Sequence, residues 1–310
     1  MRVVDLHCDS LYESVTKNIA LNDSSLEVVL NSAPESRKLQ CYAVWVPDGF
    51  SPIEAEKLFY SAAKRLDEEC KRLSIELLKP GSGCKKAFSS HNNSAYLTIE
   101  NGLALGNKLD NVRRFAEMGV RMMTLTWNAE NAIGGGADTK KGLTGFGKQV
   151  VREMERAGMI IDISHASEEL FYDVAESTSK PFVASHSNAY SVTSHRRNLK
   201  NGQIREIIRR KGLFGLNFHN AFLNDSPDRA SVYDILRHAE HFLSLGGDDC
   251  LCFGSDFDGG VLPYDIKDSR DYDKIYELFL QHHYKQESVD KIFFENALNF
   301  FENFDIQRIL

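Results

Sequence analysis

Six residues of the kinds that bind metal ions stand at or just after the ends of apolar, strand-like runs. They are His7, Asp9, Glu100, His165, His186 and Asp256. In the clearest cases, His165 follows the run "MIIDIS" and His186 follows "PFVAS". Imidazole and carboxylate ligands together suit zinc first, with manganese, iron or cobalt as alternatives. The residue types therefore predict a metal site that assists the hydrolysis of an amide or an ester.

Each of these residues alone also fits an ordinary structural role. A histidine after a strand commonly bonds to a loop, Glu100 could cap a helix, and the aspartates of "GSDFDGG" could form a turn. Six such residues at equivalent places would need several independent coincidences. Three imidazoles and three carboxylates also exceed the three protein ligands that a catalytic zinc usually has. A two-metal site, in which a carboxylate bridges ions about 3.5–4 Å apart, fits the set better.

Strand-like and helical patterns alternate along the chain, and this alternation would place the six residues together. Near-continuous apolar strands separated by helices predict a parallel sheet covered by helices. The number of runs favours a closed (β/α)8 TIM barrel in a single domain, residues 1–310, over an open doubly wound sheet. In such a barrel the active site lies at the C-terminal ends of the strands. The eight runs are 2–6, 41–46, 95–99, 120–126, 159–164, 181–185, 213–218 and 251–255.

Helical patterns occupy several of the intervals between these runs. The spacing of apolar residues predicts helices near 53–73, over 147–158, from Ser167 onward and over 231–245. A small β excursion is expected between the first of these helices and the third strand-like run. The tail, residues 286–310, is predicted to form C-terminal helices that pack on the base of the barrel.

Composition and charge narrow the class of protein. The chain has 310 residues, of which 42% are hydrophobic, so it can bury a large core. A net charge of −7 disfavours nucleic acid as a partner, because phosphate contacts need clustered Lys and Arg. No apolar run approaches the ~20 residues of a membrane span, and the N-terminus does not resemble a secretory leader. We therefore expect a cytoplasmic protein with no membrane or nucleic-acid partner, whose six cysteines are reduced thiols.

Five blocks of the sequence carry a resemblance to a known family. They are "DLHCDSL", "LTIENG", "GLTGFGKQVVREMERAGMIIDISHAS", "PFVASHSNAYSVTSHRRNLKN" and "GSDFDGG". In order and content they resemble the renal or membrane dipeptidase family, within the amidohydrolase superfamily of barrel metallohydrolases. The resemblance implies a zinc-dependent dipeptidase that hydrolyses the peptide bond of free dipeptides through a hydroxide activated by two zinc ions per chain. It also suggests a homodimer.

The resemblance places all six residues at the strand ends in contact with metal ions, Asp256 among them. By this resemblance, His7 and Asp9 would bind one zinc ion. His165 and His186 would bind the second ion. Glu100 would bridge the two ions, which gives it a catalytic role as well as a structural one.

The remaining roles that the resemblance implies concern the proton and the substrate. Asp256 would contact the first ion and carry a proton to the leaving amine. Arg197 would grip the terminal carboxylate of the substrate. Trp127 replaces a histidine of the family, so it is either a single hydrogen-bond donor or a wall of the pocket. His219 replaces a tyrosine, and it could donate to the substrate carboxylate or compensate for the missing histidine.

Two other functions stay open from the sequence. A related amidohydrolase acting on N-acyl amino acids, lactones or other amides would use the same metals. A non-catalytic metal-binding or interaction protein is the other alternative, but a binding scaffold would have no need for Asp256.

The histidines without an assigned role do not follow strand-like runs; they are His91, His195, His238, His241, His282 and His283. We expect the last four to lie on helix surfaces; they are His238, His241, His282 and His283. The glycine-rich loop 128–142 lacks the spacing of a phosphate-binding loop, and we expect it to form a mobile edge of the pocket.

Overall fold

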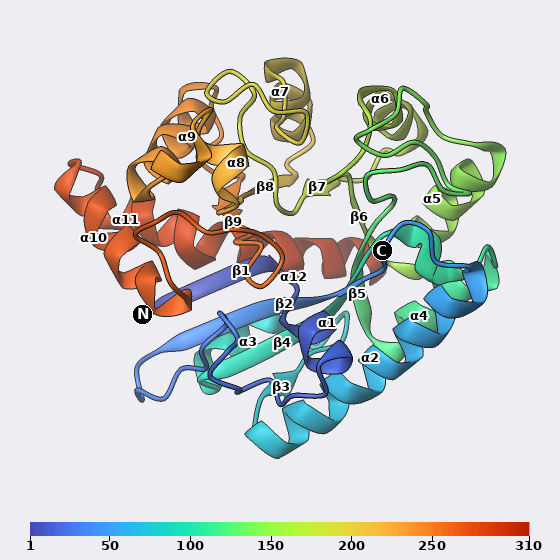
Figure 1. Cartoon of the computed structure of the whole chain (residues 1–310), viewed down its shortest axis with the longest axis horizontal. Coiled ribbons are helices and arrows are strands. Elements are labelled where there is room, and N and C mark those ends of the chain that lie inside the picture. Colours follow the sequence, from blue (N-terminus) through green and yellow to red (C-terminus); the bar gives the residue numbers. More distant parts are fainter. Residues whose placement is uncertain (310) are drawn as a thin grey trace.

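Parallel strands form a closed barrel that is surrounded by helices (Figure 1). The computed structural model describes the backbone of residues 1–309 and the side chains of residues 1–305. The strands follow one another in the order β2-β1-β9-β8-β7-β6-β5-β4, and β2 pairs with β4 to close the barrel. The predicted single-domain (β/α)8 barrel is therefore confirmed. Its strands are β1 (Arg2–Cys8), β2 (Arg37–Trp45), β4 (Asn93–Glu100), β5 (Val120–Thr124), β6 (Ile160–Asp162), β7 (Val183–Ala184), β8 (Leu213–Leu216) and β9 (Leu251–Phe253).

Burial on both faces explains the near-continuous apolar sequences of the barrel strands. Every residue of β4 is buried, and in β2 only the two terminal residues are partly exposed. A parallel strand with helices on one side and the barrel interior on the other has no face toward water. The predicted β excursion is the short strand β3 (Glu76–Leu77), which pairs with the N-terminal part of β4.

Local signals in the sequence set where the covering helices begin and end. These helices are α1 (Ser10–Thr16), α2 (Pro52–Leu73), α3 (Cys84–Ser90), α4 (Asp110–Met118), α5 (Gly145–Ala157), α6 (Glu168–Ser177), α7 (Asn201–Arg209), α8 (Asn220–Leu223) and α9 (Val232–Ser244). A capping box formed by Ser51 and Glu54 starts α2. The hydroxyl groups of Thr144 and Ser167 cap α5 and α6. Gly158 ends α5 with φ +69°, a conformation that favours glycine.

C-terminal helices cover the end of the barrel where the strands begin. They are α10 (Tyr272–Gln281), α11 (Gln286–Asp290), a π-helical turn (Lys291–Glu295) and α12 (Asn296–Ile309). The π-helical turn packs against β1 and β9, and α12 packs against β8 and β9 (Figure 1). Arg121, near the start of β5, is fully buried there and donates to Asp305 Oδ1 at 2.6 Å. The prediction that the tail closes the base is confirmed.

The pairing register brings the C-terminal ends of neighbouring strands to one level of the barrel. Trp45 of β2 pairs with Glu100 of β4, and Glu100 pairs with Thr124 of β5. Thr124 in turn pairs with Asp162 of β6, which pairs with Val183 of β7. A single row of residues therefore runs along one rim. Side chains that follow this row share one opening, as in other barrel enzymes.

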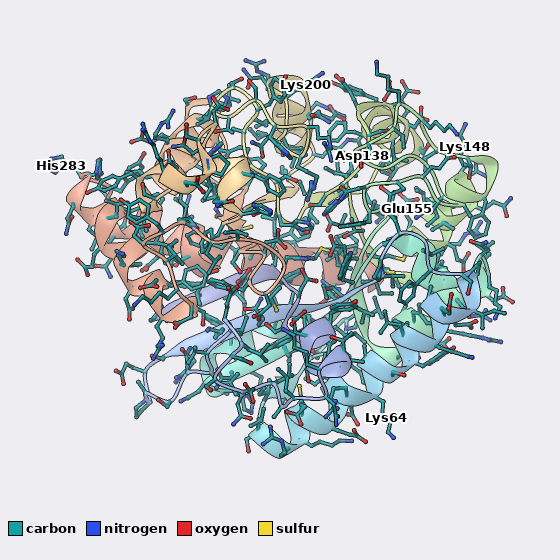
Figure 2. All side chains as sticks on the ribbon, in the orientation of Figure 1. Lys64, Asp138, Lys148, Glu155, Lys200 and His283 are labelled. Atoms are coloured by element: carbon teal, nitrogen blue, oxygen red, sulfur yellow. The ribbon has the colours of Figure 1, made fainter. Side chains whose placement is uncertain are left out.

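Charged and polar side chains cover the outside of the molecule, as Lys64, Lys148 and His283 illustrate in Figure 2. His282 and His283 are exposed, as predicted, and His241 is half-buried. All six cysteines are buried and free of disulfide bonds. Within residues 1–309, no helix combines the length and the apolar character that crossing a bilayer requires.

His238 of α9 is fully buried, so its predicted place on a helix surface was wrong. Its Nδ1 accepts the backbone N–H of Ala189 at 3.1 Å, and its Nε2 lies 3.1 Å from the carbonyl oxygen of Leu223. The reason is that α9 packs against α8 and α10 as well as against the barrel. A helix covered on several sides has less free surface than its sequence pattern suggests.

Removal of the partner of Arg121 is expected to destabilise the protein strongly. The Arg121 guanidinium lies 5.3 Å from the Phe301 ring and 5.6 Å from the Tyr96 ring, in surroundings that offer few polar replacements. Asp305→Ala would leave this buried charge without its carboxylate, a change that typically costs about 3–5 kcal/mol. Urea unfolding followed by circular dichroism measures the loss.

A matched control breaks an ion pair on the surface. Arg113 and Glu117 pair at 3.8 Å, with side chains that are 68% and 70% exposed. Glu117→Ala should change the free energy of unfolding by less than about 1 kcal/mol, because exposed pairs contribute little. Equal losses in the two variants would contradict the structural importance of the buried pair.

Candidate metal centre

A cavity of about 340 Å³ opens at the C-terminal ends of the strands. The location is the one that barrel enzymes use for their active sites. Two of the predicted metal ligands, His7 and His186, are buried close to the residues that line it. Predicted site residues in the lining of the cavity are Asp9, Glu100, Trp127, His165, Arg197, His219 and Asp256.

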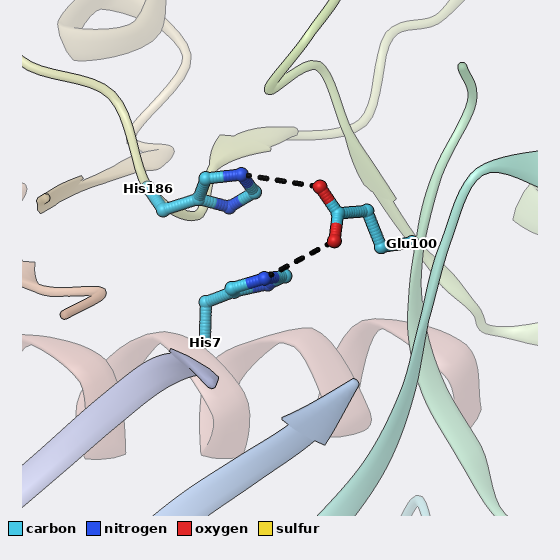
Figure 3. A group of neighbouring side chains, drawn as sticks. All are labelled: His7, Glu100 and His186. Atoms are coloured by element: carbon cyan, nitrogen blue, oxygen red, sulfur yellow. Dashed lines mark ion pairs between the residues drawn. The ribbon is translucent and has the colours of Figure 1, made fainter. Parts of the chain in front are cut away.

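Glu100 lies between two histidines that come from distant parts of the chain (Figure 3). Glu100 is the last residue of β4, His7 belongs to β1, and His186 follows β7. His7 Nε2 lies 3.4 Å from Glu100 Oε2, whereas His186 Nε2 lies 3.6 Å from Glu100 Oε1. The two oxygens of one carboxylate therefore face different histidines.

His165 completes the group on the Oε1 side of Glu100. Its Nε2 lies 2.7 Å from Glu100 Oε1 and 3.0 Å from His186 Nε2. The Nδ1 atom of His165 lies 2.9 Å from Asn128 Oδ1, and that of His186 lies 2.7 Å from Ser185 Oγ. Both rings are thus held by the protein through Nδ1, and their Nε2 atoms face Glu100 and each other.

A second group of ligand-type atoms surrounds His7. Asp9 Oδ2 lies 3.6 Å and Asp256 Oδ1 lies 3.7 Å from His7 Nε2, both beyond hydrogen-bonding distance. His7 Nε2 and Asp9 Oδ1 are buried and have no hydrogen-bond partner among the described residues. Buried polar atoms without partners are costly, and a cation would satisfy them. Ligand atoms of His7, Asp9 and Asp256, and likewise of His7, Glu100 and His186, lie within 4.8 Å of one another.

The close approach of these groups shifts their pKa values in opposite directions. Burial, followed by the Glu100 carboxylate, raises the pKa of Asp9 to about 7. Burial alone would lower the pKa of His7, but Glu100 and Asp9 outweigh it and raise that pKa well above its usual value. Burial and the Arg197 guanidinium lower the pKa of His165 to about 3. Strong shifts of opposite sign in one cavity are typical of functional sites.

Two of the six residues adopt a left-handed backbone conformation. His165 and Asp256 each have φ +65°. Such a conformation outside glycine costs of order 1–3 kcal/mol and persists where the surroundings enforce it, commonly at active sites. Gly259 gives the carboxylates room, because a Cβ at this position would overlap Asp9 Oδ2 and lie 2.6 Å from Asp256 Oδ1.

Asn217 holds Asp256 and was missed by the sequence analysis. Its Nδ2 donates to Asp256 Oδ2 at 2.9 Å, which leaves Oδ1 facing His7. Burial alone would raise the pKa of Asp256, but His186 and His7 lower it below its usual value. The sequence did carry a signal for Asn217. It is a polar residue that directly follows a strand, β8, as the predicted ligands do.

Two buried aspartates inside strands brace the rim and were also missed. Asp5 accepts the backbone N–H of Ser255 at 2.9 Å and its hydroxyl at 2.6 Å. Asp162 accepts the backbone N–H of Ser185 at 2.9 Å and its hydroxyl at 2.5 Å. Each serine immediately precedes one of the six predicted ligands. An acidic residue within an apolar run was the signal that could have revealed both.

Arg197 is buried beside the acidic and imidazole groups, and its hydrogen bonds are weak. Nη1 lies 3.5 Å from Ser187 Oγ, and Nη2 lies 3.4 Å from the carbonyl oxygen of His186. Its Nε has no partner among the described residues. Burial lowers the pKa of Arg197 to about 10. A buried guanidinium with so few partners is suited to bind a carboxylate.

His219 lines the cavity and carries a ring N–H. It caps the N-terminus of α8, and its Nδ1 accepts the backbone N–H of Ala221 at 3.2 Å. The ring proton therefore lies on Nε2. His219 and His195 both pack on Phe222, with ring centroids 4.3 Å and 4.6 Å from it. His195 also lines the cavity, which the sequence analysis did not predict.

Trp127 belongs to an aromatic wall of the cavity. Its ring lies 5.1 Å from that of Trp45, which in turn lies 4.7 Å from the ring of Tyr12. All three residues line the cavity. Trp127 also packs near His165, with ring centroids 6.0 Å apart. This placement favours the interpretation of Trp127 as a wall of the pocket.

The glycine-rich loop after β5 is anchored by hydrogen bonds, although we expected a mobile edge. Asn131 Nδ2 donates to Asn101 Oδ1 at 2.8 Å, and the backbone N–H of Ala129 donates to Asp48 Oδ2 at 2.7 Å. Asn128, at the start of the loop, contacts His165. The loop therefore supports the site as well as lining it.

The fold and the site together define a class of protein, the metal-dependent hydrolases built on a (β/α)8 barrel. A model of the membrane dipeptidase family, peptidase family M19, matches residues 1–307 of the chain. The chain belongs to this family, and it is a hydrolase of the metallo-dipeptidase class. The family resemblance seen in the sequence is confirmed.

Two relatives each match 62% of the chain. An uncharacterized protein of the pqqA 5' region of Klebsiella pneumoniae is 34% identical over 203 residues, which is 62% of this chain and 75% of that protein. An uncharacterized dipeptidase of Schizosaccharomyces pombe is 30% identical over 203 residues, which is 62% of this chain and 48% of that protein.

Two crystal structures share the fold over nearly the whole chain. The M19 metallopeptidase described as dipeptidase AC has a TM-score of 0.90 and 26% identity, covering 97% of this chain and 98% of that one. A Rhodobacter sphaeroides metallopeptidase bound to a phosphinate mimic of L-Ala-D-Ala has a TM-score of 0.87 and 24% identity. The match covers 97% of this chain and 99% of that one.

Gly259→Ala is expected to reduce metal content, because the new Cβ would displace the carboxylates of Asp9 and Asp256. We expect fewer bound metal ions per chain by elemental analysis, with an unchanged far-ultraviolet circular dichroism spectrum. Gly145→Ala is the matched control, since a Cβ at Gly145 meets nothing within 4 Å. Full metal content in Gly259→Ala would show that the carboxylates do not need this space.

Proposed function

We propose that the protein is a zinc-dependent dipeptidase that hydrolyses the peptide bond of free dipeptides at a two-metal centre. The observation that carries the proposal is the placement of Glu100. One oxygen of its carboxylate faces His7, and the other faces His165 and His186. A carboxylate with a set of ligand-type atoms on each side is the arrangement expected of a bridging ligand between two ions.

The residues present fit two divalent cations of this kind. His7, Asp9 and Glu100 would hold one ion with Asp256 beside it, and Glu100, His165 and His186 would hold the other. The unpartnered His7 Nε2 and Asp9 Oδ1 support this, as buried atoms that need a positive partner. Mixed imidazole and carboxylate ligands suit zinc. Two such ions, when bound, lower the pKa of a water molecule and polarise the scissile carbonyl.

Asp256 is suited to move the proton during hydrolysis. Asn217 occupies its Oδ2, so Oδ1 is the atom free to accept a proton from the attacking water. The depressed pKa of Asp256 keeps this oxygen ionised before the reaction. Asp256 lines the cavity, from which Oδ1 can deliver the same proton to the leaving amine.

Arg197 and His219 are suited to hold the carboxylate end of the substrate. The Arg197 guanidinium has only long hydrogen bonds and an unpartnered Nε. His219 lines the same cavity and would donate a hydrogen bond from Nε2, and Trp127 would enclose the substrate from the aromatic wall. A cavity of about 340 Å³ lies at the small end of the range for ligand sites, which suits a dipeptide. The cytoplasmic location and the homodimer stay predictions.

A substrate panel on zinc-loaded protein tests the proposed function. It contains free dipeptides, including those with a D-residue at the carboxyl end, together with N-acyl amino acids and lactones. Dipeptides should have the highest kcat/KM. Activity restricted to N-acyl amino acids or lactones would overturn the dipeptidase proposal in favour of the related amidohydrolase. Full activity in metal-free protein would refute the metal centre.

Asp256→Asn should nearly abolish turnover while most of the zinc stays bound. An amide cannot accept the proton, and loss of a general acid–base group typically lowers the rate by about 10²–10⁴-fold. Steady-state kinetics and elemental analysis of the same preparation measure the two effects. Retained turnover would remove Asp256 as the proton carrier.

Arg197→Met should weaken only those substrates that carry a free terminal carboxylate. We expect kcat/KM for a free dipeptide to fall by roughly 10- to 100-fold, the equivalent of one lost charged hydrogen bond. The corresponding dipeptide amide is the internal control and should be affected little. Equal losses for both substrates would argue that Arg197 serves the fold and does not bind the substrate.

A further inference from the structure

A chain of hydrogen bonds links a buried carboxylate to His186 through a single hydroxyl group. Ser185 Oγ lies 2.5 Å from Asp162 Oδ2 and 2.7 Å from His186 Nδ1. All three residues are fully buried, so water does not compete for these bonds. Asp162 ends β6, whereas Ser185 and His186 follow β7. The chain therefore spans two neighbouring strands at the rim.

Only one arrangement of protons fits this chain. Asp162 Oδ1 accepts the backbone N–H groups of Ser164 and Ser185, both at 2.9 Å, and Oδ2 accepts the Thr124 hydroxyl at 2.7 Å. An ionised carboxylate has no proton to donate, so the single hydroxyl proton of Ser185 points at Asp162. Ser185 Oγ then offers only lone pairs to His186. The ring of His186 must carry its proton on Nδ1.

This arrangement leaves the Nε2 atom of His186 with a free lone pair. That atom lies 3.0 Å from His165 Nε2 and 3.6 Å from Glu100 Oε1. His165 donates from Nδ1 to Asn128 Oδ1 at 2.9 Å, so its Nε2 also presents a lone pair. Three electron-rich atoms directed at one small volume repel one another unless a cation lies among them.

We propose that Asp162 and Ser185 are positioning residues that select the metal-binding tautomer of His186. They act by fixing where the ring proton sits, and no proton is transferred along the chain. Partners that hold the second nitrogen of a ligand histidine commonly change metal affinity about 10–100-fold when they are mutated. The inference rests on the proposed function, because it takes His186 as a ligand of one ion.

Asp162→Asn tests the direction of the hydrogen bonds from Ser185 to Asp162 and from His186 to Ser185, with almost no change in side-chain size. The two backbone N–H groups hold the remaining oxygen at the Oδ1 position, so the new NH2 group faces Ser185 Oγ. That NH2 donates to Ser185, which turns the hydroxyl proton toward His186 Nδ1 and places the ring proton on Nε2. The proton then blocks the metal, and zinc affinity at one of the two sites should fall about 10–100-fold.

Three comparison variants separate this effect from simple loss of stability. Thr124→Ala removes a donor to the same Asp162 oxygen without touching His186, and it should leave zinc affinity unchanged. Ser185→Ala removes the link and should weaken zinc binding less than Asp162→Asn, because the ring can then adopt either tautomer. The double variant Asp162→Asn/Ser185→Ala should bind zinc more tightly than Asp162→Asn alone, since the reversed donor is gone.

Two measurements decide the outcome. Competition with a chelating dye gives the zinc dissociation constants, and nitrogen-15 NMR of histidine-labelled protein shows which ring nitrogen of His186 carries the proton. The inference would be overturned if the Asp162→Asn variant kept the wild-type His186 signal and bound zinc as tightly as the Thr124→Ala variant does. Wild-type protein with a proton on His186 Nδ1 but no affinity for zinc would instead refute the proposed metal function, so the two failures are distinguishable.

Discussion

The crowding of ionisable groups into one buried volume is the constraint on which the rest of this structure depends. Three carboxylates and three imidazoles meet at the rim of the barrel, and most of them are hidden from water. Burial and the neighbouring Glu100 carboxylate disfavour the charge on Asp9, and they raise its pKa to about 7. The rigid register of the barrel holds the groups in place, and the left-handed turns at His165 and Asp256 aim them inward.

The supporting residues explain how this cluster keeps its shape. Asp5 and Asp162 each tie two strand ends together, and Asn217 and Asn128 each hold one ligand-type side chain from the far side. These four residues act on the site by positioning other side chains, without contact with the substrate. At the opposite end of the barrel, the buried Arg121 pairs with the carboxylate of Asp305. The residues that stabilise the base are therefore separate from the residues of the site.

Much of this arrangement could be predicted from sequence because its signals are local. Apolar runs give the strands, and a polar residue after each run marks the rim, so His165 and His186 were found. Asp162 was missed because its role depends on the hydroxyl group of Ser185, which lies 23 residues later in the sequence. His238 was misplaced because helix periodicity does not reveal how many neighbours a helix has. The direction of each hydrogen bond likewise emerges only from three-dimensional pairing.

The pairing of the first strand with the last has a consequence for the order of events during synthesis. Asp5 accepts hydrogen bonds from Ser255 and from the Tyr272 hydroxyl, 250 and 267 residues later. Asp5 is hydrated while the chain is unfolded, and its protein partners are synthesised only near the end of the chain. Contacts of such long range slow folding. The contacts that close the barrel between β1 and β9 can therefore form only after Ser255 and Tyr272 have been synthesised.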